Sequence, residues 1–148
     1  MCHQGLYRLK LLKYQDNNMP SIFTKIINGE IPCYKVAEDD DFLAFLDINP
    51  LAKGHTLVIP KKEVDYIFDL DDDLFTRLHL FAKKVARAID KSVVCERVGV
   101  AIIGLEVRHA HIHLVPLKNI GDLNFANPKL KLTREEFLAI AEKITFNL

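Results

Sequence analysis

The chain has 148 residues, of which 49% are hydrophobic and 27% charged, a composition typical of a soluble globular protein with its own core. Twenty basic residues balance twenty acidic ones, so the formal net charge is zero and the strong positive field of a duplex nucleic-acid binder is absent. The longest uncharged apolar run, residues 98–105, is far shorter than the roughly 20 residues of a membrane helix. We therefore expect no nucleic-acid partner and no membrane span.

The cysteines and the N-terminus bear on location and domain organisation. Cys2, Cys33 and Cys95 are odd in number and irregular in spacing, so we expect free thiols and a cytoplasmic location. Residues 1–18 lack the continuous apolar segment and the cleavage site of a signal peptide. We predict that 1–18 are a poorly ordered N-terminal extension and that 19–148 form a single domain.

The first predicted elements after residue 18 are a short helix and three strands. Ser21 is a suitable N-cap for the helix, and an Asn-Gly pair at 28–29 is a suitable end for it. Apolar runs bounded by turn residues then predict strands over 34–37, 42–46 and 55–60. The short connections favour antiparallel pairing of these strands.

A long helix, two strands and a final helix complete the predicted order. Three aspartates at 71–73 suit a helix N-terminus, and apolar residues at helical spacing continue this helix to about Asp90. Strands are predicted over 98–105 and 107–117, and a capping-box pattern at 133–136 predicts the last helix. These elements predict an α+β fold with a mainly antiparallel sheet.

Three of the six histidines alternate with apolar residues in the run HAHIHLV, residues 109–115. Because alternate residues of a strand share a face, we expect the imidazoles of His109, His111 and His113 to line one side in steps of about 6.6 Å. Each would need its own partner if it were buried for structural reasons alone, so the pattern favours a functional site.

Two interpretations of the histidine run are open on spacing alone. Imidazoles at alternate strand positions can bind a metal, with His55 or Glu63 completing the coordination. Alternatively, His111 is a nucleophile toward phosphorus or an acyl centre, and its neighbours hold its tautomer and bind the oxyanion. The nucleophile needs a neutral imidazole whose Nε2 lone pair faces the electrophile while its Nδ1–H is held by a carbonyl or carboxylate.

Three blocks of sequence resemble the histidine triad (HIT) superfamily. HAHIHLV is similar to its His-φ-His-φ-His-φ-φ signature, SIFTKIINGEIP at 21–32 to its opening helix, and FLDINPLAKGHTLVIPK at 45–61 to its central strand-turn-strand. The resemblance implies a HIT-like α+β fold for 19–148, with a mainly antiparallel five-stranded sheet, one long helix and shorter flanking helices. It also implies a homodimer across which the sheet continues.

The resemblance further implies a nucleotide hydrolase that acts at the α-phosphate of purine nucleoside 5′-phosphoramidates or related phosphoanhydrides and releases a nucleoside monophosphate. By position, His111 is the nucleophile that forms a covalent nucleotidyl-histidine, and the carbonyl of His109 holds its Nδ1–H. His113 contacts the phosphate and assists the leaving group, and His55 matches a family histidine behind the triad. Asp47 matches the acid that binds the ribose hydroxyls.

Four apolar residues match the family's clamp around the purine: Phe23, Ile26, Phe45 and Ile48. The expected partner is thus a purine nucleotide, and no cofactor is expected. Two alternatives remain open. One is a dinucleoside polyphosphate hydrolase or nucleotidyl transferase, and the other is a nucleotide-binding or interaction module with little catalysis.

The chain departs from the family pattern just before the triad. Many HIT hydrolases carry Gly-Gln-Ser/Thr-Val there, whereas this chain has Leu105 and Glu106 at the two polar positions. Leucine cannot donate a hydrogen bond, and an ionised Glu106 would repel a phosphate if it pointed inward; an outward orientation is the alternative. These changes bear on the leaving group and hence on the substrate.

A second departure concerns zinc. Some bacterial members carry a structural zinc site made of Cys-x-x-Cys in the opening helix and a histidine after the central strand. This chain has Ser21, Thr24 and Glu63 at those positions. With hydroxyls and one carboxylate in place of thiolates and imidazole, we expect no bound zinc and no metal site.

Overall fold

The structure, a computed structural model, describes residues 19–148. The elements in chain order are α2 (Ile22–Ile27), β1 (Lys35–Glu38), β2 (Phe42–Leu46), β3 (Thr56–Pro60), the 3-10 helix η1 (Ile67–Asp69), α3 (Asp72–Ser92), β4 (Arg97–Ala101), β5 (Ile112–Leu117), the 3-10 helix η2 (Ile120–Asp122) and α4 (Arg134–Phe146). The predicted extension at 1–18 lies outside the described residues, and its separation from a single domain at 19–148 stays a prediction.

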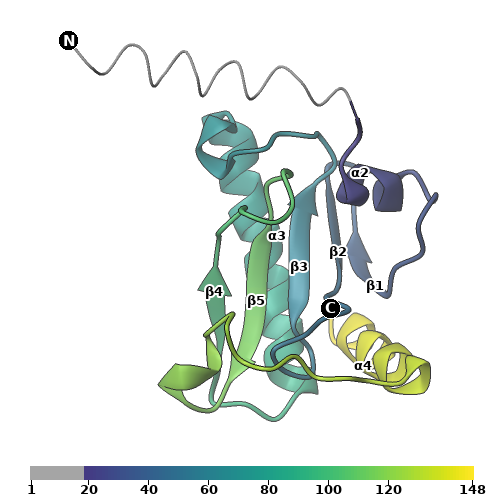
Figure 1. The fold of residues 1–148 in the computed structure, drawn as a ribbon, viewed down its shortest axis with the longest axis vertical. Helices are drawn as coiled ribbons and strands as arrows, with labels where there is room; N and C mark the ends of the chain where they lie inside the picture. Colours follow the sequence, from purple (N-terminus) through teal and green to yellow (C-terminus); the bar gives the residue numbers. More distant parts are fainter. Residues whose placement is uncertain (1–18) are drawn as a thin grey trace.

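Five strands form one antiparallel sheet in the order β1-β2-β3-β5-β4 (Figure 1). Strands β2 and β3 are buried along their whole length, because both faces of the sheet are covered. The predicted α+β fold with a mainly antiparallel five-stranded sheet and one long helix is confirmed. Continuation of the sheet across a homodimer concerns a second copy of the chain and stays a prediction.

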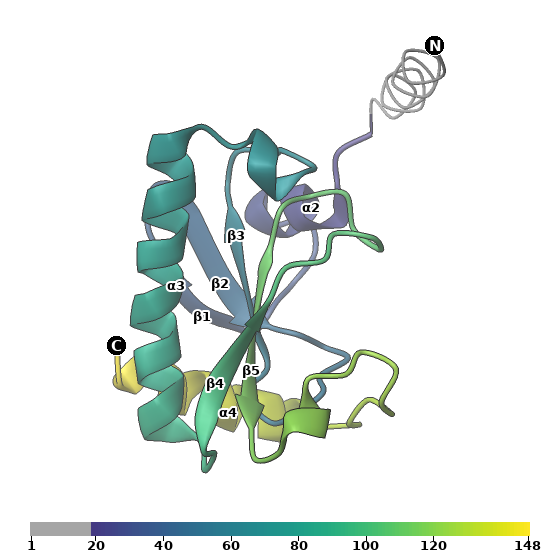
Figure 2. The same cartoon turned by 90° about the vertical axis from the view of Figure 1, so that its left-hand side faces the viewer.

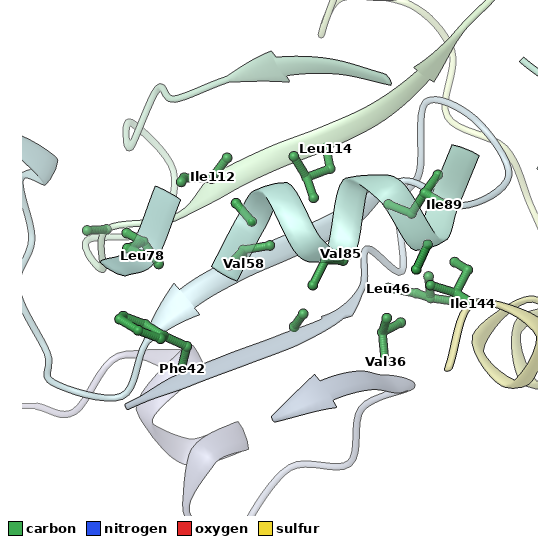
Figure 3. Packing of buried hydrophobic residues seen from close by; sticks show 14 of the residues in the cluster. Val36, Phe42, Leu46, Val58, Leu78, Val85, Ile89, Ile112, Leu114 and Ile144 are labelled. Atoms are coloured by element: carbon green, nitrogen blue, oxygen red, sulfur yellow. The ribbon is translucent and has the colours of Figure 1, made fainter. Parts of the chain in front are cut away.

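The two faces of the sheet have different covers. α3 runs along one face, and α2 lies against the other (Figure 2). Between the sheet and α3 is the main core, to which α4 also contributes; it includes Val58 of β3, Leu78 of α3 and Ile144 of α4 (Figure 3). A smaller cluster on the opposite face packs Phe23 of α2 against residues such as Phe45. Because side chains alternate along a strand, β2 and β3 supply residues to both cores.

Local capping agrees with the prediction at three helices. Ser21 accepts a hydrogen bond from the N–H of Thr24, and Asp71 caps α3 in the same way. Thr133 and Glu136 form the predicted capping box of α4. Each bond satisfies a backbone N–H that the first helical turn leaves without an internal partner.

The predicted boundaries of the last two strands were wrong. β4 ends at Ala101 and β5 begins at Ile112, so residues 102–111 form a connection instead of the ends of two strands. Gly104 within it has φ +71°, a left-handed conformation that breaks a strand and that glycine adopts without strain. The apolar run and the alternating run that suggested strands here line a pocket instead. His109 and His111 therefore precede the strand, and only His113 lies on it.

β2 has its predicted bounds, β1 is shifted by one residue and β3 begins one residue later than predicted, which is within the usual variation of element boundaries. The two 3-10 helices were not predicted. Within residues 19–148, no helix has the length and apolar character needed to cross a membrane.

Candidate active site

A pocket of about 430 Å³ lies beside α2, where the end of β2 meets the connection 102–111. It contains all five residues predicted to bind substrate, namely Asp47, Phe23, Ile26, Phe45 and Ile48. His111 and His113 line the same pocket, with ring centroids 4.8 Å apart. His109 and His55 do not line it and are buried behind it. The structure thus brings together residues that are far apart in the sequence.

A larger groove of about 750 Å³ lies between α3 and β4. Its only histidine is His79, and none of the predicted site residues lines it. The smaller pocket is the candidate active site because it alone, among the pockets described for residues 19–148, combines two triad imidazoles with a carboxylate and apolar walls.

His111 has the tautomer that a nucleophile needs. Its Nδ1 lies 2.6 Å from the carbonyl oxygen of His109. Because a carbonyl oxygen only accepts, Nδ1 carries the proton and Nε2 carries the lone pair. Burial lowers the pKa of His111, so the imidazole is neutral near pH 7.

His113 presents a hydrogen-bond donor through a chain of fixed tautomers. The backbone N–H of Leu51 donates to Nδ1 of His55 at 3.0 Å, so the proton of His55 is on Nε2. This Nε2–H donates to Nδ1 of His113, also at 3.0 Å. His113 therefore carries its proton on Nε2, where it is available to a ligand in the pocket. Burial lowers the pKa of His55 to about 4 and that of His113 to about 3, so both rings are neutral near pH 7.

His109 is held from both sides of its ring. Nε2 lies 2.7 Å from the carbonyl oxygen of Pro60 and therefore carries the proton. Nδ1 accepts a hydrogen bond from the hydroxyl of Ser21 at 2.7 Å. Burial lowers the pKa of His109, and its side chain has no access to the pocket. His109 contributes to the site through its backbone carbonyl, which accepts the Nδ1–H of His111.

Asp47 follows β2 and is oriented by a turn. Its Oδ1 accepts the backbone N–H of Asn49 at 2.9 Å, while Oδ2 is 3.6 Å from Nε2 of His55, beyond hydrogen-bond distance. Burial raises the pKa of Asp47, and the Asn49 N–H and the Lys129 ammonium partly oppose this shift. One carboxylate oxygen is thus available to a ligand.

Asp47, His55 and His113 form the one group of metal-ligand type found among the described residues, with one ligand atom from each within 4.8 Å of the others. A carboxylate and two neutral imidazoles are donors that transition metals accept. The His55–His113 hydrogen bond occupies two of these nitrogens, however, and would have to break before both could ligate one ion.

The three positions related by resemblance to a zinc site meet beside His109. The backbone N–H of Ser21 donates to Oε1 of Glu63 at 3.1 Å, and the hydroxyl of Thr24 donates to Oε2. The lone pair on Nδ1 of His109 is already used by Ser21. Hydroxyls, one carboxylate and an occupied imidazole nitrogen do not fit a tetrahedral zinc site.

The sequence-based prediction missed two contributors from the segment after β5. The ring of Phe125 packs edge-on against His113, with centroids 4.7 Å apart, and lies 6.2 Å from His55. The Lys129 ammonium lies 5.9 Å from the centre of the Phe125 ring. A single aromatic residue in an Asn-, Lys- and Pro-rich segment was the signal that could have indicated Phe125.

Leu105 and Glu106 both line the pocket, although Leu105 is 86% exposed. Burial raises the pKa of Asp47 and lowers that of His111, and the charge of Glu106 is a smaller influence on both groups that favours their protonated forms. Glu106 is an exposed residue of the pocket lining.

Acid should destabilise the fold through the buried imidazoles. His55 and His113 have pKa values of about 4 and about 3 in the folded protein, against 6.5 for an exposed histidine. Below pH 6.5 the unfolded chain therefore binds protons that the folded chain does not, so stability falls as pH falls, by at most about 1.4 kcal/mol per pH unit for each group. We expect the free energy of unfolding, measured with urea, to decrease from pH 7 to pH 5 and to decrease less in His113→Gln. An unchanged value over this range would contradict the assignment of neutral buried rings.

The chain is similar to known proteins in its family, its sequence and its structure. The family described as HIT domain matches residues 28–120. A HIT-like protein of Borreliella burgdorferi is 42% identical over 135 residues, which cover 86% of this chain and 97% of that protein. The adenosine 5′-monophosphoramidase hnt1 of Schizosaccharomyces pombe is 38% identical over 130 residues, with the same coverage of 86% and 97%. A crystal structure of a Hit-like protein from Bartonella henselae is 34% identical, covers 90% of this chain and 98% of that one, and superposes with a TM-score of 0.76.

Proposed function

Because the chain belongs to the HIT family, we propose that it hydrolyses purine nucleoside 5′-phosphoramidates and releases the nucleoside monophosphate. The observation that carries this proposal is the pair of assigned tautomers. His111 offers an Nε2 lone pair and His113 an Nε2–H donor to one pocket that also holds a carboxylate and apolar walls. The name of the S. pombe relative agrees with a phosphoramidate substrate.

The proposed reaction has two displacement steps at the α-phosphorus. In the first, Nε2 of His111 forms a bond to phosphorus and the P–N bond to the leaving group breaks. The electron pair stays on the leaving nitrogen, which takes a proton from solvent. In the second, water attacks phosphorus, the bond to His111 breaks, and a proton returns to solvent with the nucleoside monophosphate. The Nε2–H of His113 donates to a phosphate oxygen as charge develops there.

The remaining pocket residues suit a nucleoside. The free Oδ2 of Asp47 can accept from ribose hydroxyls. Phe23 packs edge-on against both Phe45, at 5.5 Å between centroids, and His111, at 5.1 Å, so a base that enters here meets an aromatic wall beside the nucleophile. Ile26 and Ile48 complete the apolar lining, and Ile48 is 65% exposed at the mouth.

The charge of Glu106 favours a phosphoramidate over the alternative of a dinucleoside polyphosphate. A polyphosphate leaving group is strongly anionic, whereas an amine leaving group is not. Glu106 lines the pocket and its charge acts on His111, so it would repel the former. The direct test is the rate of nucleoside monophosphate release from adenosine 5′-phosphoramidate and from diadenosine polyphosphates. No release from a phosphoramidate panel would refute the proposed reaction and favour a binding module.

Glu106→Gln should change this preference. Removing one repulsive surface charge is worth on the order of 1 kcal/mol, so we expect the ratio of kcat/KM for diadenosine polyphosphate to that for phosphoramidate to rise roughly fivefold. Glu142→Gln, an exposed change on α4, is the matched control and should leave the ratio unchanged. A ratio in Glu106→Gln equal to that of the control would mean that Glu106 does not select the leaving group.

We also propose that the protein is a homodimer. β4 lies at one edge of the sheet, its residue Val100 is 55% exposed, and the groove beside it has apolar lining from β4 and β5. An uncovered edge strand can pair with the same strand of a second copy. Light scattering on the purified protein should give the mass of two chains.

A cytoplasmic location is a further proposal, supported by Cys33 and Cys95 as free thiols.

A further inference from the structure

A polar cluster outside the pocket connects α2 to the triad. It consists of Ser21, Thr24, Glu63 and His109 (the polar cluster). Glu63 follows β3 and contacts the start of α2 twice, through the backbone N–H of Ser21 at 3.1 Å and the hydroxyl of Thr24. The backbone N–H of Thr24 in turn donates to the Ser21 hydroxyl oxygen at 3.0 Å. These three bonds fix the position of the Ser21 hydroxyl.

The direction of the Ser21 hydroxyl proton follows from its partners. Nδ1 of His109 carries no proton, because Nε2 donates to the Pro60 carbonyl and burial keeps the ring neutral. Nδ1 must therefore accept, and Ser21 is its partner at 2.7 Å. The oxygen of Thr24, at 3.2 Å from Ser21, is the longer contact, and the Thr24 proton is directed to Glu63. The Pro60 carbonyl thus selects the tautomer of His109, and the Ser21 hydroxyl donates to the ring nitrogen that this tautomer leaves unprotonated.

The backbone of His109 is held by the same loop that carries Glu63. The N–H of Ala110 donates to the carbonyl of Val64 at 2.7 Å, and the ring of His109 donates to the carbonyl of Pro60. Ring and backbone are therefore tied to residues 60–64 and to α2 at once. The carbonyl of His109, which receives Nδ1–H of His111 at 2.6 Å, is oriented by these ties.

We propose that Ser21 and Glu63 are positioning residues for His111. Glu63 anchors the start of α2, and the Ser21 hydroxyl holds the ring of His109 in place through Nδ1. The carbonyl of His109 then keeps the Nε2 lone pair of His111 directed into the pocket. Hydrogen bonds thereby hold the His109 ring against the start of α2, as a bound metal ion would if these positions carried metal ligands. The expected effect on kcat rests on the proposed function, whereas the expected effect on the imidazole of His109 does not.

The kinetic test compares Ser21→Ala with Ser21→Thr. Ser21 does not line the pocket, so loss of its hydroxyl in Ser21→Ala should leave KM unchanged. The same loss should lower kcat for phosphoramidate about tenfold, because the nucleophile is then misoriented. Threonine keeps the hydroxyl and should restore kcat. Thr76→Ala removes an exposed hydroxyl of α3 and is the matched control. A rise in KM with unchanged kcat, or no rescue by threonine, would overturn the proposal.

The structural test uses no substrate and separates this proposal from the proposed function. Nitrogen-15 NMR of the imidazoles should show His109 with an unprotonated Nδ1 and a protonated Nε2 in the wild type. In Ser21→Ala and Glu63→Ala the His109 signals should change, and those of His111 should follow. If the wild type lacks phosphoramidase activity but these signals change as stated, the reaction is wrong and the positioning role stands.

Two results would contradict the role of the polar cluster itself. One is an unchanged His109 spectrum in both alanine variants at a temperature where circular dichroism shows them folded. The other is stoichiometric zinc in the purified protein together with a loss of activity in a chelator, because a metal would then hold His109. Glu63→Gln keeps an oxygen that can accept from Ser21 and should retain more of the wild-type spectrum than Glu63→Ala.

Discussion

His111→Ala should lower phosphoramidate turnover by about 10⁴-fold or more. The variant lacks the atom that we propose forms the bond to phosphorus, and loss of a covalent nucleophile costs this much in enzymes where it has been removed. The effect should appear in kcat, because Asp47 and the apolar walls of the pocket remain. Nucleotide binding, measured by calorimetry with a nucleoside monophosphate, should persist.

A second readout identifies the nucleophile directly. Rapid acid-free quenching and mass spectrometry of the wild type should find a nucleotidyl group on His111, and the variant should carry none. His79→Ala is the matched control, since His79 lies on α3 away from the pocket and bonds only to the carbonyl of Phe75 among the described residues. Turnover of His111→Ala close to that of the wild type would exclude the proposed mechanism.

Leu78→Ala should lower the free energy of unfolding by about 2–5 kcal/mol. Leu78 is fully buried at 0% exposure on the face of α3 that packs on the sheet, where it belongs to the main core. Truncation removes buried methyl groups and leaves a cavity that close-packed neighbours fill only in part. Helix propensity does not oppose this loss by more than a few tenths of a kcal/mol, because leucine and alanine are both good helix formers.

Leu80→Ala, two residues away on the same helix, is the control because Leu80 is 59% exposed. Urea unfolding should give a lower midpoint with an unchanged slope for Leu78→Ala and a midpoint near that of the wild type for Leu80→Ala. Equal losses in the two variants would mean that α3 does not pack on the sheet through the face described.

Much of the candidate site could be predicted from the sequence because its parts lie in recognisable runs. Alternation indicated the triad, whereas Asp47 and four apolar residues that line the pocket were implied by the resemblance of these runs to the HIT superfamily. Alternation in HAHIHLV was informative even where the strand was shorter than predicted. In β5, Ile112 and Leu114 enter the main core, while His113 lies on the other face beside the pocket.

Other parts of the site depend on contacts that no local pattern carries. Phe125 belongs to a polar segment without periodicity, yet its ring packs on His113. The orientation of Glu106 was open in the sequence, because a connection that contains a left-handed Gly104 has no fixed alternation. The same connection explains why the strand prediction failed over residues 102–111.

The sequence by itself determined the helix caps, the alternation of strand faces and the order of the elements. These features depend on residues close together in the chain, such as alternate positions of a strand or the capping pairs Ser21 with Thr24 and Thr133 with Glu136. Only the tertiary structure decided which nitrogen of His109 and of His113 carries its proton. The partners that decide it are 49 and 58 residues away, at Pro60 and His55. An imidazole has two possible proton positions, and only a neighbour that must accept or must donate selects between them.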